Sequence, residues 1–223
     1  MNYTELVAAI STYTENTFPT AQMNTFITQA EQRIYNSVQF PSLRKNVTGT
    51  VTASNKYLSC PDDFLATYSM AVSPVGGGNY TFLLNKDVNF IREAYPDPTS
   101  TGLPKYYALF GPTTTSGPPS VPTNELSFIL GPTPDIAYSA ELHYFYYPDS
   151  ITTAVTTWLG DNFDTVLLYG ALVEAYTYMK GEADIIALYD GKYKEALGLA
   201  KRLGDGMERQ DAYRSGQVRI PVT

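Results

Sequence analysis

The stretch TAQMNTFITQAEQRIYNSVQFPSLRKNVTGTVT, residues 20–52, contains the change of period that decides the fold. Its first part repeats apolar residues at steps of three and four, which is the spacing of one face of an α-helix. The members of this stripe are Met23, Phe26, Ile27, Ala30, Ile34 and Val38. Pro41 ends the helix, because the residue before a proline is pushed out of the α region. Residues 47–52 then alternate and are β-branched, which predicts a strand.

Helical spacing also precedes this stretch, at residues 4–13, and a β region follows it. Five further runs of alternating or β-branched residues predict strands. These runs are residues 68–72, 80–84, 105–110, 125–130 and 137–147. Residues 111–122 are rich in Thr, Gly and Pro, so we expect them to form an exposed, mobile loop. A short helix is expected at about residues 86–94.

Helical spacing returns after Pro148, and residues 163–180 carry apolar side chains on two faces. A helix with two apolar faces is either central in its own bundle or shared with a neighbouring subunit. We expect Asp161 or Asn162 to be its N-cap and Gly181 to close its C-terminal end.

A last helix is expected over residues 183–203, with Gly204, Asp205 and Gly206 as its stop. Residues 207–223 show no core-forming pattern, so we expect an extended tail. From residue 201 onward the chain has five basic and three acidic residues, whereas the chain as a whole is acidic. A mildly basic tail on an acidic body is typical of a docking arm.

Together these patterns predict an α+β protein, with an α-helical bundle of N- and C-terminal helices, an inserted antiparallel β domain and an extended C-terminal tail. Residues 1–45 and 150–204 are expected to form the two parts of the bundle, residues 46–149 the β domain, and residues 205–223 the docking tail. The sequence contains no internal repeat.

The composition narrows the class of function. With 15 basic and 22 acidic residues the net charge is -7, so the phosphates of a nucleic acid are repelled rather than bound. The single Cys and the single His exclude a disulfide framework, a multi-Cys zinc site and a His-based metal or relay site. No apolar run reaches the ~18 residues of a membrane span, and the opening residues lack the basic region of a secretory signal. We therefore expect a protein made in a reducing cytoplasm, with no membrane partner and no cofactor.

None of the familiar catalytic motifs occurs, neither a nucleophile elbow nor a phosphate-binding glycine loop nor a zinc-protease helix. The triplet Gly76, Gly77 and Gly78 indicates a turn, because no Lys or helix follows it as in a P-loop. Asp62 and Asp63 are adjacent acids after a proline. We interpret them as a turn or a helix cap rather than as an acid–base pair or magnesium ligands.

Neither the single His, the single Cys nor the tyrosines indicate a functional site. We interpret His143 as a partly buried strand histidine on one sheet face with Glu141 and Phe145, and Cys60 as a small apolar filler. The 19 tyrosines indicate packing in the core and at subunit interfaces rather than a sugar- or base-stacking platform. The sequence therefore predicts no catalytic, cofactor-binding or metal site and no enzymatic activity.

Five short motifs follow one another along nearly the whole chain. They are QAEQRIY (29–35), YLSCPDDF (57–64), GLPKYYA (102–108), LGPTPD (130–135) and LLYGALVEAYTYMK (167–180). In this order and spacing they resemble the head-to-tail adaptor, or connector, proteins of tailed bacteriophages, especially those of short-tailed phages.

The resemblance implies a structural protein without catalytic residues. Its protomer would be a helical bundle with a β insertion, assembled as a ring, generally twelvefold, between the portal and the tail. The implied partners are the portal protein, a tail protein of the nozzle or tail-tube kind, and further copies of this chain. The chain would be made in the host bacterial cytoplasm and would reside in the virion at the head-to-tail interface. DNA would pass through the channel without sequence-specific binding, which suits an acidic body.

The resemblance also implies a C-terminal segment that reaches up to the portal. Residues 217–222 alternate apolar and polar side chains over a length suited to one added strand. We expect this segment to dock on the portal by strand addition or by filling an apolar groove. The residues expected to make the contact are Arg209, Arg214, Val218, Arg219, Ile220 and Val222.

A second hypothesis is a tail or baseplate component. In that case the Tyr-rich β domain would bind a receptor glycan or another tail protein. Detectable glycan binding would favour this hypothesis over the adaptor.

Overall fold

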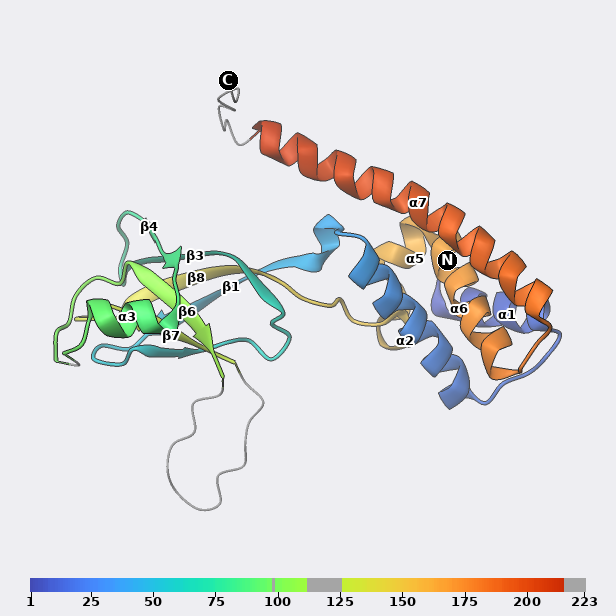
Figure 1. Ribbon diagram of the computed structural model, residues 1–223, viewed down its shortest axis with the longest axis horizontal. Coiled ribbons are helices and arrows are strands. Elements are labelled where there is room, and N and C mark those ends of the chain that lie inside the picture. Colours follow the sequence, from blue (N-terminus) through green and yellow to red (C-terminus); the bar gives the residue numbers. More distant parts are fainter. Residues whose placement is uncertain (98, 112–125, 215–223) are drawn as a thin grey trace, which may run out of the picture. The chain divides into compact units, whose positions relative to one another are not determined.

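The computed structural model describes residues 1–97, 99–111 and 126–214, and it has the expected α+β fold (Figure 1). The chain divides into two compact units. Residues 1–43 and the described residues 147–214 form a helical unit. Residues 44–146 form a β unit, which is inserted between the two parts of the helical unit.

The helical unit is organised around one central helix. Its helices are α1 (Tyr3–Thr14), α2 (Thr20–Ser37), α4 (Ile151–Ala154), α5 (Trp158–Asn162), α6 (Asp164–Tyr178) and α7 (Ala183–Arg214), with the 3-10 turn η1 (Pro41–Leu43) after α2. Helix α6 contacts α1, α2, α5 and α7. The predicted stripe of α2 is confirmed, since all six of its apolar residues, from Met23 to Val38, are buried.

The position of α6 decides between the two explanations of its two apolar faces. More than half of its residues are buried, and they lie all around the helix. These residues are Val166, Leu167, Leu168, Gly170, Ala171, Leu172, Val173 and Ala175. The helix is therefore central in its own bundle.

The expected N-cap of α6 is wrong. Asp161 and Asn162 lie inside α5, and Phe163 is the residue that precedes α6. The capping side chain in this region belongs to Thr157, whose Oγ1 accepts a hydrogen bond of 3.1 Å from the Gly160 N–H at the start of α5. Helices as short as α4 and α5 leave almost no apolar period in the sequence, so the pattern could not predict them.

The C-terminal end of α6 also differs from the expectation. Lys180, and not Gly181, takes the left-handed conformation, with a φ of 54°. The Lys180 N–H donates to the Thr177 carbonyl and the Gly181 N–H to the Tyr176 carbonyl, which satisfies the last carbonyls of the helix. Gly181 is needed for space, because a Cβ atom there would lie 2.9 Å from Cδ1 of Tyr176.

Helix α7 continues through the residues that were expected to stop it. It ends at Arg214, so Gly204, Asp205 and Gly206 lie within the helix, and the predicted end at residue 203 is wrong. A glycine in a helix interior costs roughly 1 kcal/mol relative to alanine. That cost does not end a long helix whose following residues are good helix formers. Residues 207–214, expected in an extended tail, are therefore helical.

The β unit is built from two four-stranded sheets. Its strands are β1 (Arg44–Val51), β2 (Tyr57–Ser59), β3 (Ala66–Pro74), β4 (Thr81–Phe82), β5 (Leu84–Asn85), β6 (Tyr106–Phe110), β7 (Ser127–Gly131) and β8 (Tyr138–Phe145). One sheet has the order β1-β8-β3-β4 and the other the order β2-β7-β6-β5. The named strands pair antiparallel, as expected, except that β5 and β6 pair in parallel among the described residues. The chain passes through helix α3 (Val88–Ala94) between these two strands, and parallel neighbours require such a crossover.

A single core lies between the two sheets. Its buried residues include Val51, Cys60, Phe64, Met70, Val72, Leu83, Tyr107, Phe128, Leu130, Tyr138, Ala140, Leu142 and Tyr144. On the other face of the second sheet, Ile91 of α3 packs against Ala108 and Ile129. The interpretation of Cys60 as an apolar filler is confirmed, and burial raises the pKa of its thiol to about 12.

The turn predicted at the glycine triplet is confirmed. Gly76, Gly77 and Gly78 all have positive φ, and the Gly77 N–H donates to the Pro74 carbonyl at 3.2 Å. The loop expected at residues 111–122 lies outside the described residues from residue 112 onward.

Candidate interaction surfaces

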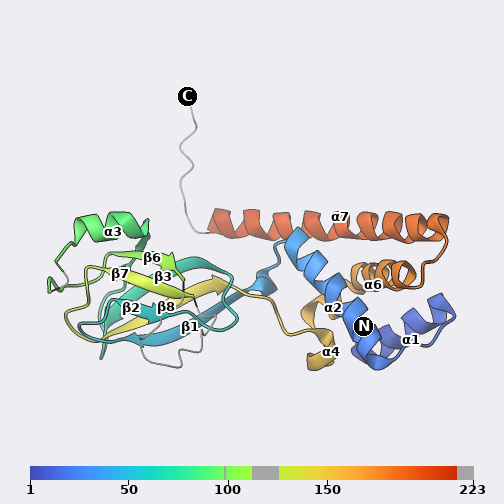
Figure 2. The same ribbon diagram turned by 60° about the horizontal axis from the view of Figure 1, so that its bottom comes forward.

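Helix α7 sets the path of the chain toward its C-terminal residues. Near its C-terminal end, α7 crosses the backbone that follows α2, and Gly204 lies at the crossing. A Cβ atom at this position would lie 3.0 Å from the Gln39 carbonyl oxygen and 3.1 Å from Cγ1 of Val38. Glycine thus allows α7 to approach this backbone closely. Figure 2 shows α7 running on beyond α2 and α6.

A group of four tyrosines fixes the other end of α7. The ring of Tyr189 on α7 stacks on Tyr176 and Tyr169 of α6, with centroids 5.1 and 6.2 Å apart. Its edge meets Tyr13 of α1 at 6.5 Å. The Tyr176 hydroxyl also donates to the Tyr13 carbonyl at 2.9 Å. These tyrosines pack within the helical unit, as many of the tyrosines were expected to do.

The structure describes only part of the expected docking tail. Arg209 and Arg214 lie in the helical backbone of α7, not in an extended segment. The other expected docking residues, Val218, Arg219, Ile220 and Val222, lie outside the described residues. The docking role of all six residues therefore stays a prediction.

The motif at residues 29–35 connects α2 to two other helices. Glu31 is buried, and its Oε1 accepts a hydrogen bond of 2.9 Å from the Ile151 N–H at the start of α4. Burial raises the pKa of Glu31, although hydrogen bonds from Ile151 and Ser150 partly oppose this. Arg33 forms a salt bridge with Glu174 of α6. The helical stripe of α2 gave no sign that a charged residue would be buried in it.

The adjacent acids of the second motif are structural. Asp62 is exposed in a turn, whereas Asp63 accepts hydrogen bonds from the Lys45 ammonium at 2.8 Å and the Tyr144 hydroxyl at 2.7 Å. Partial burial raises the pKa of Asp63, but the bonds from Lys45 and Tyr144 outweigh it and keep the pKa below its ordinary value. The carboxylate thereby connects the turn to β1 and β8.

His143 lies on the outer face of its sheet and is more exposed than expected. Its side chain is 47% exposed, with Nε2 at 3.5 Å from the Glu141 carboxylate and Nδ1 at 3.3 Å from the Ser69 hydroxyl. The shared face with Glu141 was predicted correctly, but the alternation could not show how exposed the His143 side chain is. Among the described residues, no cluster of three or more His, Cys, Asp or Glu side chains is arranged to hold a metal ion.

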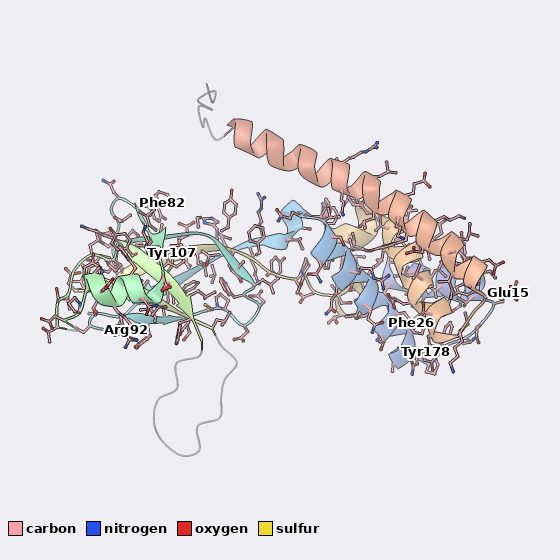
Figure 3. The ribbon with its side chains drawn as sticks, viewed as in Figure 1. Glu15, Phe26, Phe82, Arg92, Tyr107 and Tyr178 are labelled. Carbon is pink, nitrogen blue, oxygen red and sulfur yellow. The ribbon has the colours of Figure 1, made fainter. Side chains whose placement is uncertain are left out.

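The β unit exposes many large apolar side chains that sequence reasoning did not single out. Three of them alternate along the segment that passes from one sheet to the other: Tyr80, Phe82 and Leu84, of which Phe82 is 70% exposed (Figure 3). Leu83, between them, is buried in the core. The period of two at positions 80, 82 and 84 is visible in the sequence, but Leu83 beside Leu84 hides which side faces outward. Apolar side chains gathered on a surface indicate contact with another protein.

Three aromatic residues also pack against one another in the helical unit. Phe26 of α2 and Tyr178 of α6 lie 5.3 Å apart between ring centroids, and Phe18 packs against both (Figure 3).

None of the described helices is both long and apolar enough to cross a membrane.

The chain matches a family of known proteins. The family model described as SU10 adaptor protein matches residues 1–221. A comparison with curated proteins finds no match.

Proposed function

This chain belongs to the SU10 adaptor protein family, and we propose that it forms a ring between the portal and the tail of a bacteriophage particle and extends the DNA channel. The observation that carries the proposal is the match over residues 1–221, which includes both units and almost the whole C-terminal segment. The chain is a phage adaptor protein, a structural component of the virion that contacts other phage head and tail proteins. The ring, its twelvefold symmetry and the position beneath the portal of a short-tailed phage are parts of the proposal.

The course of α7 supports docking through the C-terminal residues. The helix packs on α6 and beside η1, and it then runs past them (Figure 2). An arm that leaves the body in this way reaches a partner without disturbing the packing of the bundle. Residues 217–222 would add a strand to the portal or fill an apolar groove on it, with Arg209 and Arg214 meeting acidic portal groups.

The charge of the chain supports a channel wall. A net charge of -7 gives weak attraction for DNA, so that a passing duplex is not retained. A tail protein of the nozzle or tail-tube kind would bind the opposite side of the ring.

Binding to the purified portal tests the docking proposal. The full chain, a chain without residues 215–223, and a full-length V218D/I220D variant are each mixed with portal rings and sedimented. We expect the full chain to co-sediment, and both altered chains to stay in solution with unchanged thermal unfolding, because the double variant places charge in an apolar contact. Equal binding by the chain without residues 215–223 would move the docking surface to the body of the protein.

A second candidate function is supported by the exposed aromatic side chains of the β unit. A tail component that binds another tail protein would use such a surface, for example around Tyr80 and Phe82. Binding of the full chain to a soluble receptor glycan, lost in Y80A/F82A, would favour the glycan-binding form of this candidate. Absence of a ring together with such binding would replace the adaptor proposal.

A further inference from the structure

We infer that the β unit carries a docking site for an acidic peptide segment of a partner protein, formed around helix α3. This inference rests on the proposed function, since it names the chemistry of one head or tail partner. Three hollows of about 220, 280 and 460 Å³ border this helix, and Arg92 lines all three. Figure 3 shows Arg92 on α3.

Three of the four charged residues that line these hollows are cations. Lys56 lines two of them and Lys86 the third. Neither lysine, nor Arg92, takes part in any of the ion pairs found among the described residues. The ammonium groups of Lys56 and Lys86 lie 5.4 and 5.2 Å from the ring centroids of Tyr57 and Phe90, and these cation–π contacts do not neutralise their charge.

One acidic residue also lines the hollows. Asp87 borders the largest of the three hollows, and its Oδ1 accepts a hydrogen bond of 2.9 Å from the Asn89 N–H as the N-cap of α3. The lining therefore holds three cations and one anion on a chain whose overall charge is -7, and the exposed Glu93 lies next to Arg92 on α3. This local excess of positive charge complements a negatively charged partner.

The apolar walls favour a polypeptide over DNA as this partner. Val88 and Phe110 each border two of the hollows, and so does Ile129. Phe110 is 59% exposed, although an aromatic ring of this size gains free energy when it is covered. An acidic segment with aliphatic or aromatic side chains would pair with the cations and also cover the apolar walls. A DNA backbone offers phosphates and sugars but no side chain that fills such a wall.

A labelled acidic copolymer of glutamate and tyrosine serves as the probe, and fluorescence anisotropy with the full chain is the readout. We expect saturable binding at 50 mM salt that weakens at 150 mM salt, because opposite charges are screened. R92E/K56E should weaken binding by about tenfold or more, since like charges replace opposite ones. The matched control is K105E, which changes an exposed lysine of the same unit that does not border these hollows and should alter binding by less than about twofold. R92Q provides a milder variant if the double reversal unfolds.

Several outcomes would overturn the inference. Absence of saturable binding, or equal weakening by K105E, would show that no specific site exists. Binding of duplex DNA that R92Q abolishes would assign the surface to nucleic acid. Self-association of the wild-type chain in sedimentation that R92Q removes would assign it to a second copy. Ring formation on the portal is measured separately with R92Q, so that failure of the adaptor proposal and failure of this site are distinguishable.

Discussion

Gly204 of α7 lies against the backbone of Gln39, so closely that a Cβ atom at position 204 would be 3.0 Å from the Gln39 carbonyl oxygen. This crossing fixes the position of α7 against the backbone that follows α2. A second glycine of the same helix, Gly191, has open space where its Cβ atom would be. The two positions therefore separate the cost of the close crossing from the helix propensity of glycine.

Replacement of Gly204 by alanine should destabilise the helical unit. The added methyl group meets a backbone carbonyl that cannot move aside, and overpacking of this kind typically costs about 1–3 kcal/mol, partly offset by the better helix propensity of alanine. G191A should instead stabilise the protein by up to about 1 kcal/mol. Urea unfolding followed by circular dichroism measures both. If G204A is as stable as G191A, the crossing is not a close contact in solution.

The buried Glu31 should make stability depend on pH. Its carboxyl ionises near 4.5 in the unfolded chain and at a higher pH in the folded protein, because burial raises its pKa. Its favourable contribution is therefore complete below pH 4.5 and is lost as the pH rises through the folded-state pKa. E31Q keeps an oxygen for the Ile151 N–H and cannot ionise. We expect E31Q to be more stable than the wild type at pH 7 and this advantage to shrink as the pH falls toward 4.5.

The control for this prediction is E31A. It leaves the Ile151 N–H without its acceptor, which should cost about 1–3 kcal/mol at every pH. Free energies of unfolding between pH 4 and 8 measure all three proteins. A difference between E31Q and the wild type that does not change with pH would contradict the account of Glu31.

Tyr193 of α7 should tolerate the loss of its hydroxyl. The residue is 4% exposed, and its hydroxyl has no hydrogen-bond partner among the described residues. Its ring packs close to Gly170, where an added Cβ atom would lie 3.2 Å from the ring. Y193F keeps this packing and should be neutral or stabilising by up to about 1 kcal/mol. Y193A should lose about 3 kcal/mol or more, and a similar loss in Y193F by chemical denaturation would reveal a partner for the hydroxyl.

Val155 adopts a strained backbone that a glycine would relieve. It has a φ of 67° and a ψ of -42°, and the Thr156 N–H bonds to the Ala154 carbonyl at 2.8 Å around it, which is a γ-turn. The turn directs the Val155 carbonyl toward the Tyr3 N–H at the start of α1, at 2.9 Å. V155A keeps the unfavourable conformation, so V155G should exceed it in stability by about 1 kcal/mol. Thermal unfolding that ranks V155A above V155G would show that the turn is not strained.

The long periodic elements could be predicted from the sequence because burial imposes their pattern. The apolar stripe of α2, from Met23 to Val38, is buried throughout, and the two-faced pattern of α6 matches its central position. The strands that pair with β8 were also expected, since their alternation follows the two faces of a sheet. The change of period around Pro41 thus gave the α+β fold class.

Features set by single contacts could not be predicted in this way. From the sequence Gly204 is expected to stop a helix, and only the structure shows its close approach to Gln39. Lys180 takes the left-handed backbone conformation that glycine usually adopts. The burial of Glu31 depends on the start of α4, which lies far along the chain. The cations around α3 come from separate segments, and only the fold brings Lys56 close to Arg92.

The most direct test of the adaptor proposal is electron microscopy of this chain mixed with its purified portal, alongside the chain alone. The chain alone should be mostly monomeric, because its sequence has no long heptad pattern that would force self-association. On the portal, averaged images should show a closed ring of additional density, with a mass that corresponds to twelve copies. Portal rings that remain bare in the presence of excess chain, or a closed ring formed without any portal, would contradict the proposal.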